Sequence, residues 1–213
     1  MKKLTIISDF DGTIVIYDVF EKILDKFAND DWRLYDYLVE EGKMNLEDAI
    51  LKQFSMISHL KEFEILEYAK NFLIEREYAS NLIAFCDENN IEFIIASAGL
   101  STYIKYFLTQ KLINAKVYCL EVNNYNGKLF GKFPKFNGNY KNFKEAIVEK
   151  YKKDNFFVIY VGDGFNDVFP AVKSNKIFAV EDSLLSKNLD KLKIAHEKFV
   201  SFKKILDYLK NSF

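Results

Sequence analysis

Four short apolar segments, separated by helical patterns, constrain the fold of this chain more than any other feature. We predict them as strands at residues 4–8, 91–97, 156–162 and 176–180. Between the last three segments, apolar residues recur at helical spacing. Alternation of strands with helices is typical of a parallel sheet that is covered by helices on both faces. The sequence therefore predicts an α/β fold.

Two stretches depart from this alternation. Residues from about 18 to 90 show only helical spacing, whereas the connection between two parallel strands needs a single helix. We therefore predict a helical subdomain inserted over the edge of the sheet, with Asn45 as the N-cap of one of its helices. Residues 116–122 read as an extra strand, and the Asn126–Gly127 pair that follows favours a tight hairpin turn.

The length of 213 residues fits one α/β domain that carries a smaller insertion. Apolar residues make up 49% of the chain, which is ample for a buried core of this size. We assign residues 1–14 and 91–213 to the core and residues 15–90 to a helical cap. The last helix of the cap, at about residues 77–90, is expected to lead back into the core.

The charges exclude some classes of partner. The 30 basic and 31 acidic residues are interleaved, so no basic patch is indicated that would bind nucleic acid or an anionic membrane. No apolar run approaches the roughly 18–20 residues that cross a bilayer, and the first residues turn acidic too soon for a signal peptide. We expect a cytoplasmic protein with a small-molecule partner; the sequence does not indicate its oligomeric state.

Polar residues gather where the predicted strands end. The first strand is followed by Asp9 and Asp11, the second delivers Ser97, and the third is followed by Asp163 in "GDGFND". In a parallel α/β sheet, ligands bind beyond the carboxyl ends of the strands. Lys141 is expected near the first turn of the preceding helix, with Lys144 left open as the alternative. These residues are therefore predicted to share one site.

Phosphoryl transfer to a carboxylate is the chemistry that needs this set. Asp9 and Asp11 are two residues apart and can face the same point, and Asp163 adds a third carboxylate. The three carboxylates repel one another unless a divalent cation lies between them, and oxygen ligands indicate Mg²⁺. The cation also screens an attacking carboxylate from an anionic phosphate ester. We therefore expect magnesium and a small phosphorylated substrate.

Each residue has an expected role in this reaction. Asp9 is the candidate nucleophile, and Asp11 is the candidate acid and base, which requires a raised pKa. Ser97 and the backbone N–H groups of Ala98 and Gly99 are expected to hold the phosphoryl oxygens. Lys141 is expected to supply positive charge in the transition state.

The motifs resemble those of the haloacid dehalogenase superfamily of phosphatases. The resemblance rests on "DFDGT", the serine after an apolar strand, the downstream lysine and "GDGFND". It implies a Rossmann-like core with an inserted helical cap, as in the branch of phosphatases similar to phosphoserine phosphatase. It also implies a metal held by Asp9, Asp163 and the backbone carbonyl of Asp11. Thr13, Asn166 and Asp167 lie in the same motifs and are expected to support the site, with Asp167 holding the lysine or the metal waters.

Within that branch the chain most resembles the methionine-salvage phosphatases that act on a hydroxyketo-methylthiopentenyl phosphate, and their phosphocholine and phosphoethanolamine phosphatase relatives. Phosphoserine phosphatases are the alternative, but they hold the substrate carboxylate with a cap arginine where this chain has Phe54. Asp18 matches an acidic residue aimed at the substrate and is equally an N-cap candidate. Phe54 and Asp18 are therefore the expected specificity residues, and the substrate is expected to lack a carboxylate.

Two other classes of protein share parts of this pattern. A receiver-like signalling module also forms an aspartyl-phosphate, but it needs only about 120 residues and its phosphorylated aspartate ends a middle strand. A binding domain without turnover would keep the fold, but binding phosphate needs no second carboxylate beside Asp9. The order of the motifs therefore favours an enzyme.

Overall fold

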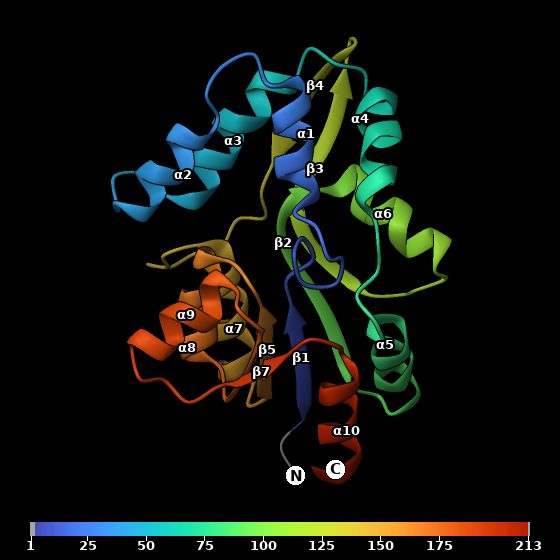
Figure 1. Ribbon diagram of the computed structural model, residues 1–213, viewed down its shortest axis with the longest axis vertical. Helices are drawn as coiled ribbons and strands as arrows, with labels where there is room; N and C mark the ends of the chain where they lie inside the picture. The colour runs from blue at the N-terminus through green and yellow to red at the C-terminus, as the bar shows by residue number, and fades with distance from the viewer. Residues whose placement is uncertain (1–2, 213) are drawn as a thin grey trace.

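The computed structural model describes residues 3–212, and a seven-stranded sheet forms its centre (Figure 1). The strands are β1 (Leu4–Ser8), β2 (Glu92–Leu100), β3 (Lys116–Tyr125), β4 (Lys128–Lys132), β5 (Phe157–Gly162), β6 (Lys176–Val180) and β7 (Glu197–Phe199). Their order is β4-β3-β2-β1-β5-β6-β7, and every neighbouring pair is parallel except β3 and β4. The predicted α/β fold is confirmed, with β7 as a strand that the sequence did not indicate.

The central strand β1 determines where a ligand binds. All of its residues are buried, as expected for a strand covered on both faces. Its neighbours are β2 on one side and β5 on the other, so the strand order reverses at β1. At such a reversal the loops beyond the strand ends separate and leave a crevice. The residues that follow β1 therefore start at the bottom of the crevice.

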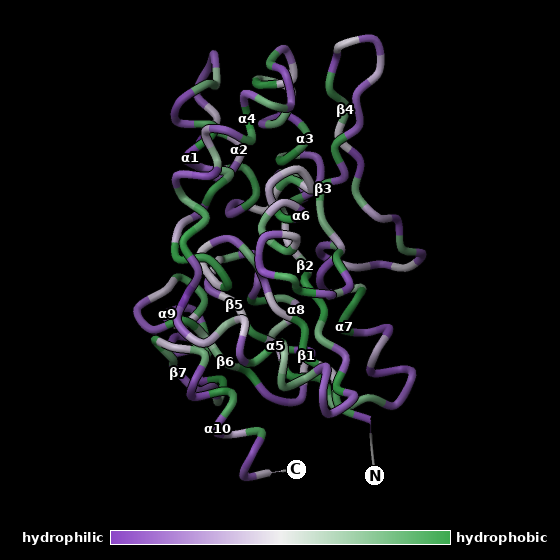
Figure 2. The backbone as a smooth tube through the Cα atoms, turned by 90° about the vertical axis from the view of Figure 1, so that its right-hand side faces the viewer, coloured by the Kyte–Doolittle hydropathy of each residue, from purple (hydrophilic) through white to green (hydrophobic). Residues whose placement is uncertain are grey.

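Helices cover both faces of the sheet. Figure 1 shows α5 (Ala79–Glu88), α6 (Ser101–Gln110) and α10 (Lys203–Ser212) on one side and α7 (Phe143–Lys153), α8 (Val168–Lys173) and α9 (Leu184–Lys191) on the other. Hydrophobic stretches run through the middle of the molecule, and many of the outer loops are hydrophilic (Figure 2). None of the described helices is long and apolar enough to cross a membrane.

Four helices stand beyond the carboxyl end of β1 and form the cap (Figure 1). They are α1 (Val19–Phe27), α2 (Arg33–Glu40), α3 (Leu46–Ile57) and α4 (Glu62–Ala69), followed by a 3₁₀ turn, η1 (Lys70–Phe72). Asn45 accepts a hydrogen bond from the N–H of Asp48 and caps α3 as predicted. The predicted helical insertion is therefore present. Its expected last helix, α5, packs on β2 and α10 in the core.

The cap is attached to the core by two paired segments and a hairpin. The outgoing and returning segments meet at Ile16, whose N–H donates to the Ile74 carbonyl at 2.9 Å. The β3–β4 hairpin extends alongside the cap, where the N–H of Leu129 donates to the carbonyl of Ser58, the C-cap of α3, at 3.3 Å. Its turn residues Asn126 and Gly127 both have positive φ, as the predicted tight turn requires.

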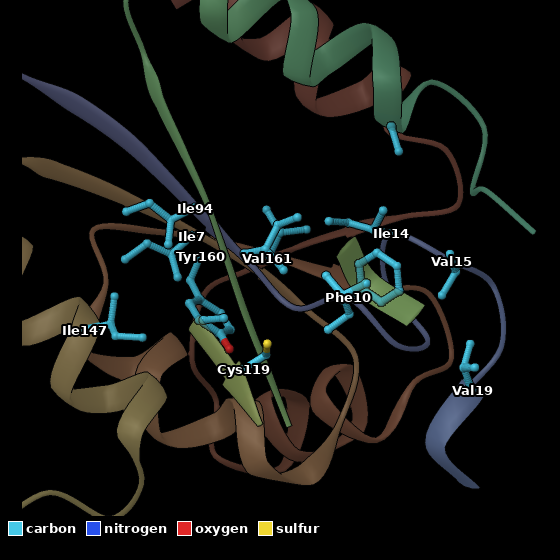
Figure 3. Packing of buried hydrophobic residues seen from close by; sticks show 14 of the residues in the cluster. Ile7, Phe10, Ile14, Val15, Val19, Ile94, Cys119, Ile147, Tyr160 and Val161 are labelled. Carbon is cyan, nitrogen blue, oxygen red and sulfur yellow. The ribbon is translucent and has the colours of Figure 1, made fainter. Parts of the chain in front are cut away.

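The hydrophobic core continues from the sheet to the first helix of the cap. Figure 3 shows Ile7 of β1 among side chains of the neighbouring elements, followed by Phe10, Ile14 and Val15 in the loop after β1 and by Val19 at the start of α1. All five side chains are completely buried. The loop that carries the predicted catalytic acids is therefore anchored along its length by apolar packing.

Candidate active site

Asp9 and Asp11 face one side of the loop after β1 because Phe10 between them faces the other. The Phe10 ring is fully buried and meets the Phe107 ring edge-on, with ring centres 5.3 Å apart. The Asp9 N–H donates to the Val161 carbonyl at 2.9 Å and continues the pairing with β5. Both aspartates are 8% exposed. The predicted pairing of the two carboxylates is thus present in the structure.

Asp9 is held by a buried lysine. Its Oδ2 atom lies 2.7 Å from Lys144 Nζ, and its Oδ1 atom accepts a hydrogen bond from the Phe10 N–H at 2.7 Å. Burial raises the pKa of Asp9 well above its usual range, and Asp167 and Asp163 add to the rise, while Lys144 opposes it. Of the charged neighbours named, Lys144 is the one that favours the carboxylate form of Asp9, which is the form that a nucleophile needs.

The structure differs from the expectation for the lysine. Lys144, 2% exposed, bridges Asp9 and Asp167, whereas Lys141 is exposed on the surface. The reason is the start of α7, where Asn142 caps the helix by accepting from the Glu145 N–H. Lys141 therefore precedes the helix, and Lys144 lies in its first turn. The structure therefore places Lys144, the alternative left open by the sequence, beside the two aspartates.

Asp11 is fixed by three donors. Its Oδ2 atom accepts from the Tyr103 hydroxyl at 2.7 Å and from Ser97 Oγ at 3.3 Å, and its Oδ1 atom accepts from the Val19 N–H at 3.1 Å. Burial is the largest cause of the raised pKa of Asp11, followed by repulsion from Asp18. The group thus combines a fixed position with a pKa suited to carrying a proton.

A break in the register of β2 forms the predicted phosphate-binding segment. Pairing with β3 shifts between Ala96 and Leu100, and the Gly99 N–H turns to donate to Ser97 Oγ at 3.0 Å. A Cβ at Gly99 would overlap both the Tyr103 hydroxyl and the Asp11 carboxylate. Glycine is therefore required where the backbone comes close to the acid.

Asp163 joins Asp9 and Asp167 in a cluster that fits a metal ion. One carboxylate oxygen from each lies within 4.8 Å of the others. Burial, followed by repulsion from Asp167, raises the pKa of Asp163 to about 7. A Cβ at Gly12, which has a φ of 68°, would overlap the Asp163 carboxylate, so the loop leaves room for this group. Hard oxygen donors at this spacing suit Mg²⁺.

The remaining residues of the two motifs support the cluster. Thr13 Oγ1 donates to Asp163 at 2.7 Å. Asp167 accepts from Lys144 at 2.8 Å and from the Tyr160 hydroxyl at 2.6 Å. Burial alone would raise the pKa of Asp167, but Lys144, the Tyr160 hydroxyl and the Gly164 N–H together outweigh burial and hold that pKa below its usual value. Asp167 therefore holds the lysine, as one of its two predicted roles required.

Asn166 lies beside this cluster with a free acceptor. Its backbone carbonyl accepts from Asn142 Nδ2 at 2.9 Å, whereas its side-chain Oδ1 is buried and has no partner among the described residues. An unpaired buried acceptor is costly unless a ligand or water satisfies it. The unpaired oxygen of Asn166 is therefore a second feature, after the carboxylate cluster, that fits a bound cation with its waters.

The acids open into a cavity of about 360 Å³ between core and cap. The core part of its wall includes the predicted site residues Asp9, Asp11, Ser97, Ala98, Gly99, Lys144, Asp163, Asn166 and Asp167. Asp18 lines it too, and its carboxylate caps α1 by accepting from the Glu21 N–H. Phe54 does not line the cavity; it is 3% exposed within the cap core. Gln53 takes the position expected for Phe54, because one residue turns the helix by about 100°.

Neither arginine of the chain reaches the cavity. Arg76 donates from Nη2 to the Gly12 carbonyl at 2.7 Å and from Nε to the Thr13 carbonyl at 2.8 Å, beneath the catalytic loop. Arg33 is exposed, pairs with Asp25 at 2.6 Å and stacks on the Trp32 ring. Sequence reasoning missed Arg76, Tyr103 and Tyr160, since no local pattern connects them with the motifs.

A family model described as haloacid dehalogenase-like hydrolase matches residues 6–169. The chain belongs to this family. The match spans both aspartate motifs, the serine and the lysine, and so confirms the predicted superfamily.

Curated relatives extend over nearly the whole chain. A 2-hydroxy-3-keto-5-methylthiopentenyl-1-phosphate phosphatase from Bacillus cereus (strain G9842) is 29% identical over 98% of this chain and 96% of its own length. One of the same description from Brevibacillus brevis is 23% identical with the same coverage. These relatives support the prediction that the chain is a hydrolase of phosphoric monoesters.

Solved structures confirm the fold. A structure described as a phospho-aspartyl intermediate analogue of phosphoserine phosphatase superposes with a TM-score of 0.73 at 22% identity and covers 98% of this chain and 99% of that one. A substrate-bound phosphoserine phosphatase complex gives the same values. The likeness therefore includes the helical cap as well as the parallel sheet.

Proposed function

We propose that the protein is an Mg²⁺-dependent phosphomonoesterase that hydrolyses a small phosphorylated metabolite through a phosphoryl group carried on Asp9. The observation that carries this proposal is the cluster of Asp9, Asp163 and Asp167 around Lys144, with Asp11 held beside it by Tyr103. A nucleophile, a separate acid, a fixed cation and a metal-binding carboxylate group are the parts that this reaction needs.

In the first half of the reaction, an Asp9 oxygen attacks phosphorus and the bond from phosphorus to the ester oxygen breaks. Asp11 gives its proton to the leaving alkoxide, and the hydrogen bond from Tyr103 keeps the carboxyl group oriented. Ser97 and the N–H groups of Ala98 and Gly99 hold the phosphoryl oxygens; Ser97 then releases Asp11, and the Gly99 N–H releases Ser97 Oγ. Lys144 offsets the charge that grows on these oxygens. The products of this half are an alcohol and phosphorylated Asp9.

In the second half, Asp11 acts as the base. It takes a proton from water, the water oxygen attacks phosphorus, and the bond between phosphorus and Asp9 breaks to release inorganic phosphate. The raised pKa of Asp11 serves both halves, because the group must exchange one proton with the substrate and with water.

The residues fit a magnesium ion. Asp9, Asp163 and the backbone carbonyl of Asp11 would hold it, with Asp167 and Asn166 directed at its waters. When bound, the ion neutralises charge on the phosphoryl group and on the carboxylates around it. Without such charge, the cluster of carboxylates within 4.8 Å would repel an anionic substrate.

The substrate we propose is a small phosphate ester without a carboxylate. The relatives named above favour a hydroxyketo-methylthiopentenyl phosphate, and phosphocholine or phosphoethanolamine is the other candidate ester. Phosphoserine is the alternative favoured by the fold. It is less well supported because Arg33 and Arg76 both have other partners and neither lines the cavity. A substrate carboxylate would meet no arginine there.

The two non-enzymatic classes are less well supported. A receiver-like module needs no proton donor over its aspartate, and a binding domain needs no acid with a raised pKa. Asp11 has both features, since it is oriented by Tyr103, Ser97 and Val19 and carries a raised pKa.

The test is release of phosphate from p-nitrophenyl phosphate with Mg²⁺, with excess chelator, and with Mg²⁺ restored. Activity should disappear on chelation and return with the metal. Asp9→Asn should abolish release while the circular dichroism spectrum and melting temperature stay close to those of the parent. Turnover by Asp9→Asn would contradict the nucleophile assignment, and full activity in chelator would contradict the metal.

A further inference from the structure

The upper part of the cavity, formed by the cap, carries charge that the proposed reaction does not use. Glu21 of α1 and Asp36 and Glu40 of α2 line it. Among the described residues that line the cavity, eight are acidic and Lys144 is the one base. Lys144 is already shared between Asp9 and Asp167. The cap wall therefore presents a strongly negative surface to the end of the substrate that lies opposite the phosphate.

Gln53 gives the second observation, and it does not depend on the charges. It is 1% exposed, and its Nε2 donates to Asp36 Oδ1 at 2.8 Å and to the Trp32 carbonyl at 3.2 Å. Two acceptors on this side fix the orientation of the amide. The Oε1 atom then lies on the other side, where no described residue donates to it. Gln53 lines the cavity, so an amide oxygen that has no donor from the protein is available to accept a hydrogen bond from a ligand.

A purely apolar tail, such as a thioether, would leave the Gln53 oxygen without a donor and would desolvate the carboxylates beside it. The wall is therefore suited to a polar tail, and the excess of carboxylates on the wall favours a positive charge on that tail.

We propose that the cap wall of Glu21, Asp36, Glu40 and Gln53 binds a protonated amine, so that the substrate is a small phosphomonoester with an ammonium group at its other end. The proposal rests on the proposed phosphatase activity and narrows its substrate class. An ammonium group donates to the Gln53 oxygen and the Asp36 carboxylate, and its charge offsets the neighbouring carboxylates. Arg33 does not take this role, because it is exposed and paired with Asp25.

The experiment compares matched pairs of esters in the presence of Mg²⁺. 2-Aminoethyl, 3-aminopropyl and 4-aminobutyl phosphate are each paired with the n-alkyl phosphate of equal heavy-atom count, in which a methyl group replaces the ammonium. We expect the amine to have the higher kcat/KM for at least one chain length, by about tenfold, which is the ratio that one charge-assisted hydrogen bond provides. The series of lengths is needed because the span from phosphate to cap wall selects one of them.

Variants then locate the preference. Asp36→Asn and Glu21→Gln should each lower the amine-to-alkyl ratio, mainly by raising KM for the amine ester. Glu41→Gln is the matched control, since Glu41 is an exposed carboxylate of the cap outside the cavity, and its ratio should equal that of the parent. Melting temperatures of all three variants separate loss of the ratio from loss of folding.

Two results overturn the proposal. One is an alkyl ester that equals or exceeds its amine partner at every length, and the other is an amine preference that survives both Asp36→Asn and Glu21→Gln. Both are distinct from failure of the proposed function, in which no ester of either kind is hydrolysed and p-nitrophenyl phosphate is also left intact.

Discussion

The two halves of the cavity are both acidic, but they use their carboxylates differently. In the core half, Asp9, Asp11, Asp163 and Asp167 each accept at least one hydrogen bond or ion pair from a buried neighbour. In the cap half, Asp36 is bonded to Gln53, whereas the carboxylates of Glu21 and Glu40 accept no hydrogen bond from the described residues. The carboxylates of the core half are therefore held in place by the protein, whereas those of Glu21 and Glu40 are available to bind a ligand.

This difference separates chemistry from selection. Groups that act on the phosphoryl group must be held in position in advance, because their reorganisation during the reaction would cost rate. Groups that recognise the variable end of a substrate contribute through binding, and they can be satisfied by the ligand itself. A change in the core half should therefore lower kcat for every substrate, whereas a change in the cap half should alter the order of substrates.

The largest effect should come from the buried lysine of the core half. Lys144→Met removes the cation between Asp9 and Asp167 and should lower kcat/KM by roughly 100- to 1,000-fold for every ester, as loss of one transition-state donor does. Steady-state kinetics at saturating Mg²⁺ measures this loss. Lys141→Met is the matched control, because Lys141 is exposed and should tolerate the change. Equal losses in both variants would contradict the assignment of the lysine.

The contrast between these two lysines shows how far sequence reasoning reaches. The sheet, the inserted helices and the strand ends with Asp9, Asp11, Ser97 and Asp163 followed from local periodicity, because each strand and its next residues form one continuous segment. The choice of lysine depended on where α7 begins. That start is fixed by Asn142, and helix boundaries are the least reliable part of such predictions.

The cap half was harder to predict because its residues come from three separate helices. Whether Gln53 or Phe54 meets the cavity depends on the rotation of α3, which is set by packing with the other cap helices and the β3–β4 hairpin. Glu21 and Asp36 each look like an ordinary solvated helix residue in the sequence. Only the fold brings them to one wall, so no motif indicated them.

An intermediate effect is expected where the two halves are joined. Arg76 follows the returning cap segment, and its guanidinium holds the carbonyls of Gly12 and Thr13 under the catalytic loop. Arg76→Lys keeps the charge but loses the two-point contact. We expect kcat to fall roughly 10-fold for all esters, because small misplacement of reacting groups is costly. The ratio between amine and alkyl esters should stay at the parent value.

Stopped-flow and steady-state measurements on the parent and Arg76→Lys check this expectation, with the melting temperature recorded beside them. Loss of two hydrogen bonds to a charged group should also cost about 1–3 kcal/mol of unfolding free energy. A variant that changes the order of substrates while keeping kcat would show that the loop acts on selection, and the division between the two halves would then be wrong.

The smallest effect is the most specific, because it depends on the cap half alone. Burial, followed by repulsion from Asp18 and Asp36, raises the pKa of Glu21 to about 7, with Asp25 adding to the rise and Arg33 opposing it. Burial raises the pKa of Asp36 to about 6; Asp18 and Glu40 add to the rise, while Gln53 and Arg33 oppose it.

As the pH falls through 7 and then 6, these two carboxylates take up protons and lose the charge that favours an ammonium group. The amine-to-alkyl ratio of kcat/KM should therefore be greatest near pH 8 and fall several-fold by about pH 5.5. The ratio is the correct measurement because titration of Asp9, Asp11 and Asp163 affects both esters equally and cancels. Each kcat/KM is calculated on the dianion concentration of its own ester, because the ammonium group lowers the second pKa of the phosphate. Asp36→Asn should flatten the lower part of the profile. A ratio that stays constant across this range, in a parent enzyme that prefers the amine, would mean that neutral groups such as Gln53 make the selection and that the cap carboxylates take no part in it.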